Sequence, residues 1–116
     1  MATRWCDVVV DSADPVVLAR FWSALLDKPI TGEGVDEVDV AFSDGQELVF
    51  VAVSDPKVVK NRVHLDLASA STEDQAAIVA RAVELGAKPV DIGQGDVPWV
   101  VLADPEGNEF CVLTPR

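Results

Sequence analysis

Apolar and polar positions follow two different periods along this chain, and the same succession of periods occurs twice. The first succession opens with a mostly apolar stretch over residues 4–11, which predicts a strand. Apolar residues then recur at helical spacing, at Leu18, Phe21 and Trp22, and predict a helix with one apolar face. Weaker strands are predicted over residues 35–42 and 47–53, on either side of a Ser-Asp-Gly turn.

The second succession repeats this order of elements. A strand is predicted to begin near Arg62, and a helical stripe follows that includes Ile78 and Ala82. Two further strands are predicted over residues 97–103 and 109–113, separated by the turn sequence Asp-Pro-Glu-Gly-Asn. The two halves of the chain are therefore predicted to fold in the same way.

Residues at the expected helix ends support both helices. Asp14 can cap the free amides of the first helix, and Pro15 suits its first turn. Thr72 with Gln75 three residues later resembles a capping box at the start of the second helix. Gly86 is a natural residue just beyond the end of that helix.

Short sequence matches connect the two halves. Lys-Pro-Ile at residues 28–30 returns as Lys-Pro-Val at residues 88–90. The same offset places Phe50-Val51 on Phe110-Cys111, each after a turn that begins with Asp. Such an internal repeat has to be recognised first, because it decides how the whole fold is interpreted.

The repeated unit is a βαβββ module, so the fold class is α+β with the helices on one face of the sheets. The modules span about residues 4–54 and 61–114 and share one core in a single domain of 116 residues. Each opens with a polar residue in an apolar strand, Asp7 in the first and His64 in the second. We expect a site where the two modules meet.

Composition and charge narrow the classes of function. Cys6 and Cys111 lie in predicted strands without any metal-binding spacing, which favours a reducing compartment over a disulfide framework. No apolar run reaches membrane-spanning length and the first residues lack the basic and apolar regions of a signal peptide, so a cytoplasmic location is expected. A net charge of −11 argues against nucleic acid as a partner. The only basic cluster (Lys57, Lys60 and Arg62) fits either a solvated linker or a small-anion site.

Three local sequences carry a resemblance to a known superfamily. They are the Asp-Pro start of the first helix with the segment up to residue 26, the segment 60–67 around His64, and the turn 104–108 before an apolar strand. Together they resemble the vicinal oxygen chelate superfamily of glyoxalase I, extradiol dioxygenases and bleomycin-resistance proteins. The set looks closest to the glyoxalase-like domain group. The resemblance implies a curled mixed sheet, with the helices on its outer face, and a homodimer.

The resemblance also implies positions for metal ligands. In metal-using members each module offers two ligands to one divalent ion on the concave side of the sheet. The first-strand positions fall on Asp7 and His64, and the last-strand position of the second module falls on Cys111. The repeat partner of Cys111 is Val51 by the sequence match. Lyases of this family carry a carboxylate at both last-strand positions, so this chain lacks the full ligand set.

Strand alternation predicts which other residues share that side, since alternate side chains of a strand point to one face. Asp7 then shares its face with Trp5 and Val9, and His64 shares its face with Asp66. For Asp66 the alternative is a strand-end residue bonded to backbone or water.

One further aromatic residue can belong to the site. Trp99 is suited to stacking on a planar ligand at the rim. A core or dimer-contact role is the alternative for both Trp5 and Trp99, while Trp22 is expected in the core.

Asp7, His64 and Cys111 could hold Zn²⁺ with water as the fourth ligand. A simpler alternative is an ion pair between Asp7 and His64, which could still act as a general base. We therefore expect a small-molecule-binding protein of the glyoxalase/bleomycin-resistance type without a complete catalytic metal site. The alternatives are a lyase or isomerase with His64 as base, with or without Zn²⁺, and a purely structural dimerising module.

Overall fold

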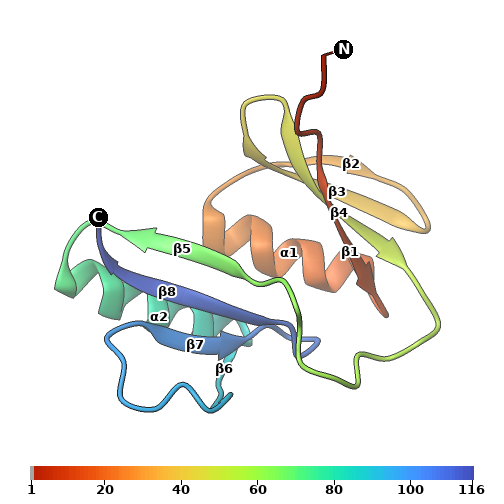
Figure 1. Cartoon of the computed structure of the whole chain (residues 1–116). Helices are drawn as coiled ribbons and strands as arrows, with labels where there is room; N and C mark the ends of the chain where they lie inside the picture. Colours follow the sequence, from red (N-terminus) through yellow and green to blue (C-terminus); the bar gives the residue numbers. More distant parts are fainter. Residues whose placement is uncertain (1) are drawn as a thin grey trace. The chain divides into compact units, whose positions relative to one another are not determined.

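The computed structural model describes residues 2–116, which form two compact units with the boundary between Pro56 and Lys57 (Figure 1). Each unit contains one helix and one four-stranded mixed sheet. The predicted α+β class and the two βαβββ modules are confirmed. No helix in the described part of the chain is both long and apolar enough to cross a membrane.

The first unit is drawn from red to yellow in Figure 1. Its elements are β1 (Val8–Ser12), α1 (Pro15–Leu26), β2 (Ile30–Glu33), β3 (Glu37–Ser43) and β4 (Gln46–Ala52). The strand order is β1-β4-β3-β2, with β1 parallel to β4 and the other pairs antiparallel. The helix α1 packs mainly on β3 and β4.

The second unit, green to blue in Figure 1, has the same arrangement. Its elements are β5 (Leu65–Ser69), α2 (Thr72–Leu85), β6 (Lys88–Pro89), β7 (Val100–Ala103) and β8 (Glu109–Pro115). The strand order is β5-β8-β7-β6, with β5 parallel to β8. The helix α2 packs mainly on β8 and β5.

The helix ends follow their capping residues, with one correction. The Asp14 side chain accepts a hydrogen bond from Val17 N at 3.3 Å, and Gly86 ends α2 with a φ of 120°, as predicted. The predicted cap at Thr72 is wrong by one residue. The cap is Ser71, whose extended backbone lets its hydroxyl accept from Asp74 N at 3.0 Å.

Alternate strand residues form the core of each unit. In the first unit the fully buried positions are Val38, Val40, Leu48 and Phe50, on the two strands against which α1 packs. Trp22 is 3 % exposed and packs edge-on against Phe21, which confirms its predicted core position. The core of the second unit contains Leu102, Phe110 and Val112. Because strands alternate, the residues between these positions lie on the opposite face of each sheet.

The first strand is shorter than predicted. It begins at Val8, so Cys6 and Asp7 precede the strand rather than lying inside it. Cys6 is exposed, which corrects its predicted position in an apolar strand. His64 also stands immediately before its strand, β5.

Strand register corrects one detail of the repeat. Val9 pairs with Val49 in the first unit, as Asp66 pairs with Cys111 in the second. The residue that corresponds to Cys111 is therefore Val49, and Val51 lies two positions further along β4. The sequence match aligned Phe50 with Phe110. The register of the two hairpins instead aligns the pair Ala41–Glu47 with the pair Ala103–Glu109, which places Val49 opposite Cys111 in the comparison.

Candidate functional site

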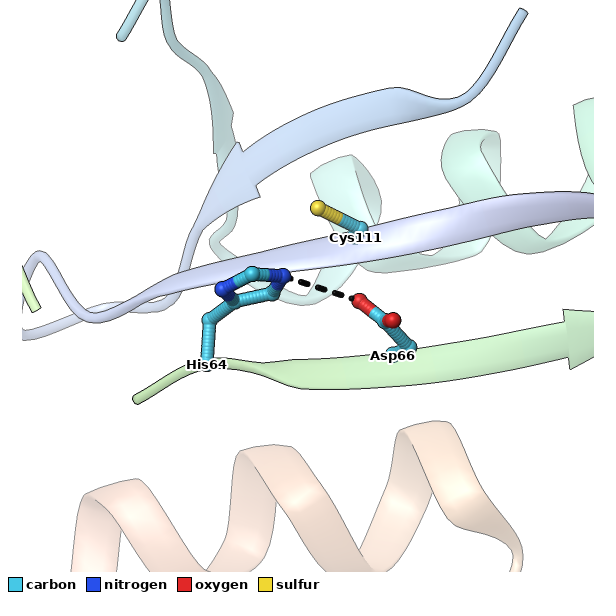
Figure 2. Close-up of side chains that lie close together, drawn as sticks. All are labelled: His64, Asp66 and Cys111. Atoms are coloured by element: carbon cyan, nitrogen blue, oxygen red, sulfur yellow. Dashed lines mark ion pairs between the residues drawn. The ribbon is translucent and has the colours of Figure 1, made fainter. Parts of the chain in front are cut away.

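Three chemically competent side chains of the second unit come together on one side of its sheet (Figure 2). The nearest ligand atoms of His64, Asp66 and Cys111 all lie within 4.8 Å of one another. Asp66 in β5 is the register partner of Cys111 in β8. His64 stands two residues before Asp66, just outside β5, and its ring reaches the carboxylate of Asp66.

His64 and Asp66 are in direct contact, and the contact is an ion pair when the imidazole is protonated. His64 Nε2 lies 3.1 Å from Asp66 Oδ1, and the two side chains are 43 % and 47 % exposed. A pair this accessible to water contributes about 0–1 kcal/mol to stability, so its main effect is to orient the ring. With Nε2 donating to the carboxylate, Nδ1 of the neutral ring carries the lone pair that can accept a proton.

Cys111 supplies a buried thiol behind this pair. Its side chain is 4 % exposed, and burial raises its pKa, as do the charge of Asp66 and the hydrogen bond from the thiol to that carboxylate. Lys60 opposes these effects. Cys111 is therefore a protonated thiol near neutral pH and not an activated nucleophile, because thiolate chemistry requires a lowered pKa.

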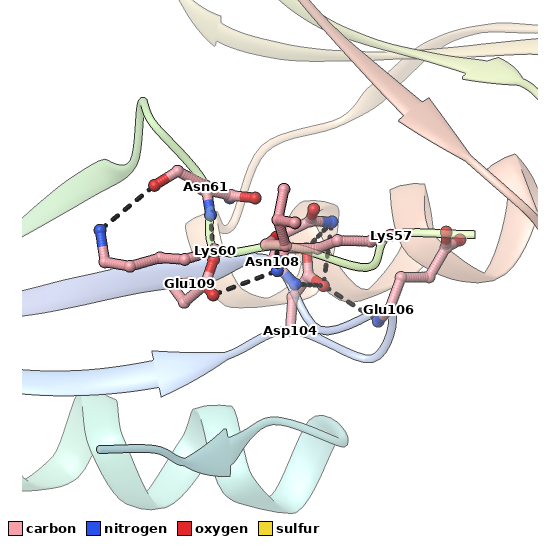
Figure 3. A network of polar contacts seen from close by, with 8 residues as sticks. Lys57, Lys60, Asn61, Asp104, Glu106, Asn108 and Glu109 are labelled. Atoms are coloured by element: carbon pink, nitrogen blue, oxygen red, sulfur yellow. Dashed lines mark hydrogen bonds and ion pairs between the residues drawn. The ribbon is translucent and has the colours of Figure 1, made fainter. Parts of the chain in front are cut away.

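A polar network anchors the chain segment that leads into His64 (Figure 3). Glu109 at the start of β8 accepts hydrogen bonds from Lys57 Nζ at 3.1 Å and from Asn61 N at 3.0 Å. Burial alone would raise the pKa of Glu109, but the backbone N–H groups of Asn61 and Glu109 and the ammonium of Lys57 outweigh it and lower the pKa. Sequence analysis missed this contact, which joins residues far apart in the chain.

The basic cluster of the sequence is therefore partly used within the protein. Lys57 pairs with Glu109, and Lys60 donates to the backbone oxygen of Asn61 at 3.2 Å. These contacts favour the linker interpretation over a small-anion site, because the ammonium of Lys57 already has a carboxylate partner.

The Asp-Pro-Glu-Gly-Asn turn fixes where β8 begins and hence where Cys111 lies. Asp104 is 4 % exposed, and its Oδ1 accepts from Glu106 N and Asn108 N, each at 2.9 Å. Gly107 has a φ of 87°, which favours glycine at this position. The side-chain amide of Asn108 completes the network by donating to both oxygens of Asp104.

Comparison with known families shows which proteins share this combination of two βαβββ units and the 104–108 turn. The sequence model described as the glyoxalase-like domain matches residues 7–113. The chain belongs to the glyoxalase-like domain family. No curated protein matches its sequence.

Solved structures share the fold of this glyoxalase-like domain. A glyoxalase/bleomycin resistance protein/dioxygenase family enzyme from Burkholderia phytofirmans PsJN matches with a TM-score of 0.74 at 17 % identity, over 91 % of this chain and 94 % of that chain. A glyoxalase/bleomycin resistance protein from Albidiferax ferrireducens T118 has a TM-score of 0.70 at 22 % identity, over 97 % and 98 %. A glyoxalase-related enzyme from Fulvimarina pelagi has a TM-score of 0.74 at 14 % identity, over 96 % and 87 %.

Asp7, the other predicted polar residue, has local partners in the first unit of the glyoxalase-like domain. Its Oδ1 accepts from Glu47 N at 3.2 Å, and its Oδ2 accepts from the Cys6 thiol at 3.4 Å. Asp7 belongs to the first unit and His64 to the second. Their predicted approach to one another stays a prediction.

The other residues predicted to line the site are more exposed to solvent than the side chain of Cys111. Val9 is 61 % exposed on β1, and Val51 is half-buried on β4. Trp5 is 63 % exposed and precedes the strand, so the alternation used to place it beside Asp7 does not apply. Trp99 is 39 % exposed and directly precedes β7, whose Val101 is the register partner of Cys111.

One acidic residue of the first unit was missed by sequence reasoning. Asp39 pairs with Val49 across the hairpin, and its buried Oδ1 has no hydrogen-bond partner among residues 2–116. Burial raises the pKa of Asp39, and a hydrogen bond and charge repulsion from Glu37 raise it further. The signal was available, since a carboxylate inside the alternating strand Glu37–Ser43 is unusual.

A separate hollow of about 240 Å³ lies on the first unit, near the β3–β4 turn. Its lining residues are Thr31, Ala41, Ser43, Gly45, Gln46 and Glu47. None of the residues predicted for the site lines it. Its side chains already bond one another, Thr31 to Glu47 and Ser43 to Gln46, so it offers few groups for a ligand.

Proposed function

We propose that this glyoxalase-like protein binds a small molecule at the group formed by His64, Asp66 and Cys111, in the manner of the glyoxalase/bleomycin-resistance type. The convergence of an imidazole, a carboxylate and a thiol within 4.8 Å carries this proposal. Such a small set of polar groups beside buried apolar residues is typical of ligand sites, where it sets the orientation of the ligand. The register neighbour Val101, 3 % exposed, supplies apolar surroundings.

The charge of the site and of the chain favours a neutral or cationic ligand. Asp66 is half-exposed beside His64, and the net charge of the chain is −11. A negative surface raises the local concentration of cations and lowers that of anions. Val49 and Cys111 stand where the resemblance implies carboxylates, so the chain lacks the ligand set of the family's metal-dependent lyases.

The single histidine of the chain offers a direct test. We would titrate three matched aromatic fragments, one cationic, one neutral and one anionic, into chelator-treated protein and follow the imidazole C–H signals of His64 by NMR. The cationic and neutral fragments should shift these signals, and Asp66→Asn should remove the preference for the cation. Asp55→Asn, a change of the same charge at an exposed linker position, is the matched control.

Two results would contradict the binding proposal. The first is a set of His64 signals that no fragment shifts at millimolar concentration. The second is an equal loss of cation preference in Asp55→Asn and Asp66→Asn, which would assign the preference to the overall charge instead of the site.

A second candidate function is a lyase or isomerase that uses His64 as a general base. The 3.1 Å ion pair between His64 Nε2 and Asp66 Oδ1 favours it, because a carboxylate that orients the ring leaves Nδ1 ready to accept a proton. The assay is hydrogen–deuterium exchange beside the carbonyl of small hydroxyketones in D₂O. His64→Ala should fold normally and slow the exchange by roughly 10²–10⁴-fold. Unchanged exchange in that variant would remove His64 as the base.

The family resemblance also implies a divalent metal. His64, Asp66 and Cys111 offer one nitrogen, one oxygen and one sulfur donor, a set that fits Zn²⁺ better than Mg²⁺ or Mn²⁺. When bound, such an ion polarises a carbonyl oxygen as a Lewis acid. The protein's own contribution would be to orient the imidazole through Asp66 and to hold the thiol in a buried position.

The proposal also covers the oligomeric state of the protein and its location in the cell. We expect a homodimer, since closed twofold dimers are the commonest oligomers, and a cytoplasmic protein. Light scattering that shows only monomer at working concentration would contradict the dimer.

A further inference from the structure

We propose that Asp39 and Glu37 on β3 form a carboxyl pair that shares one proton, and that this proton fastens the edge strand β2 to the sheet of the first unit. The pair lies outside the group of His64, Asp66 and Cys111, so this inference does not rest on the proposed function. It gives the first unit a response to pH that the second unit lacks.

Asp39 occupies an inner position of the first sheet. Its register partners are Gly32 on β2 and Val49 on β4. Its neighbours Val38 and Val40 are fully buried on the side that α1 covers, so Asp39 points to the opposite face. Asp39 Oδ1 is buried and has no hydrogen-bond partner in the described part of the chain. This position disfavours an ionised carboxylate, because a charged oxygen without a donor loses its hydration.

The edge strand makes room for this carboxyl group at Gly32. A Cβ atom on Gly32 would lie only 2.9 Å from Asp39 Oδ2, so the carboxyl group of Asp39 lies against the backbone of β2. β2 pairs with β3 alone, since it is the last strand in the order β1-β4-β3-β2 (Figure 1). A charge on Asp39 therefore acts directly on a strand that has only one neighbour.

Glu37 supplies the second carboxyl group. It stands two residues before Asp39 on the same strand, and therefore on the same face of the sheet. Burial raises the pKa of Asp39, and a hydrogen bond with Glu37 and the charges of Glu37 and Asp7 raise it further. Two carboxylates this close repel each other when both are ionised, so the pair favours one shared proton. In that state the protonated carboxyl group of Asp39 donates to the carboxylate of Glu37.

The other titratable groups on this face are acidic as well. Asp7 precedes β1, Asp11 lies on β1, and Glu47 lies on β4, while the register partner of Asp39 on β2 is a glycine. The four strands of the first unit contain no Lys, Arg or His. No cation at a strand position therefore offsets the charge that Asp39 gains when it loses its proton.

The sign of the pH dependence follows from the raised pKa of Asp39. Its contribution to the stability of the first unit is complete below the ordinary pKa of an Asp carboxyl group, about 4, and is lost as the pH rises through the raised value. β2 is therefore held more tightly in acid than at neutral pH. Within this window the opening of β2 should become up to about tenfold more frequent per pH unit, because opening releases one proton.

The second unit is the internal control. Val101 is its counterpart of Asp39, since Val101 pairs with Cys111 as Asp39 pairs with Val49. Val101 is 3 % exposed and has no proton to lose. The amides of β7 should therefore not lose protection from hydrogen exchange as the pH rises over the same window.

The experiment measures amide hydrogen exchange of the full-length protein by NMR at a series of pH values from about 4 to 7. Rates are expressed as protection factors, which removes the pH dependence of the exchange chemistry itself. Protection of the β2 amides should fall as the pH rises. Asp39→Asn should keep the protection of the acid form at neutral pH, because its amide is uncharged and can still donate to Glu37. Asp44→Asn, the same change at an exposed turn position, is the matched control and should behave as the unchanged protein does.

A second readout needs no variant and covers an Asp39→Asn protein that fails to fold. The carboxyl carbon of Asp39 in ¹³C-labelled protein should titrate at a higher pH in the folded state than in urea. A folded-state midpoint at or below the midpoint in urea would overturn the inference. Constant protection of β2 over the pH series would overturn it too, as would an Asp44→Asn variant that abolishes the pH dependence as fully as Asp39→Asn.

Discussion

Replacing Glu109 by Gln tests whether the network in Figure 3 stabilises the second unit. The carboxylate of Glu109 is 12 % exposed and accepts from the ammonium of Lys57 and the amide of Asn61. Hydrogen bonds to a charged group contribute about 1.5–3 kcal/mol each. Lys57 is 22 % exposed, and the Gln oxygen can still accept from Asn61, so we expect a loss of about 1–2 kcal/mol.

The pH dependence gives this prediction its sign. The pKa of Glu109 is lower in the folded protein than its ordinary value. Its contribution to stability is therefore complete above that ordinary value and is lost as the pH falls through the lowered folded value. The difference between the unchanged protein and Glu109→Gln should be largest near pH 7 and should disappear in acid.

The assay is urea unfolding followed by far-UV circular dichroism at pH 7 and at a series of acidic pH values. Glu47→Gln is a matched control, because Glu47 occupies the corresponding hairpin position of the first unit, is half-buried there and accepts from the neutral hydroxyl of Thr31 instead of from an ammonium. Equal free energies of unfolding for Glu109→Gln and the unchanged protein at pH 7 would refute the reasoning. So would a difference that persists unchanged in acid.

Three further predictions concern the elements that frame the site. Ser71→Ala should cost about 1 kcal/mol in thermal unfolding while Thr72→Ala costs less, and the reverse order would restore the cap that sequence analysis placed at Thr72. Asp104→Ala should cost about 2–3 kcal/mol, since it removes the acceptor of the 104–108 turn, and a loss below 0.5 kcal/mol in urea unfolding would contradict that role. A thiol reagent should label Cys6 in the native protein and Cys111 only after unfolding, because Cys6 is exposed, whereas Cys111 is buried and the pKa of its thiol is raised. Labelling is followed by mass spectrometry, and rapid labelling of Cys111 in the native protein would contradict this prediction.

Local patterns predicted those features that depend on neighbours in the chain. The Asp14-Pro15 start of α1 and the Gly86 end of α2 were confirmed, because a helix end is decided within a few residues. Alternation also placed His64 and Asp66 on one side, where the structure shows their ion pair. The family resemblance was confirmed by the match over residues 7–113.

Features that depend on register or on distant partners could not be predicted from the sequence alone. The β3–β4 and β7–β8 hairpins have the same length, and their register makes Val49 the counterpart of Cys111. Alignment of Phe50 with Phe110 in the sequence pointed to Val51 instead. The contact of Glu109 with Lys57 crosses from β8 to the linker and leaves no local signal. The direct contact of Asp66 with Cys111 also requires knowledge that β5 and β8 are adjacent and parallel.

The occurrence of Val9 and Val49 at the places where the second unit has Asp66 and Cys111 has a practical consequence for protein engineering. The first unit thus carries two valines in place of the carboxylate and the thiol, on a backbone with the same strand order. The double substitution V9D and V49C would transplant a carboxylate and a thiol into that unit, next to a carboxylate that already precedes β1. A designer could in this way compare the engineered pair in the first unit with the native group of His64, Asp66 and Cys111 in the same polypeptide.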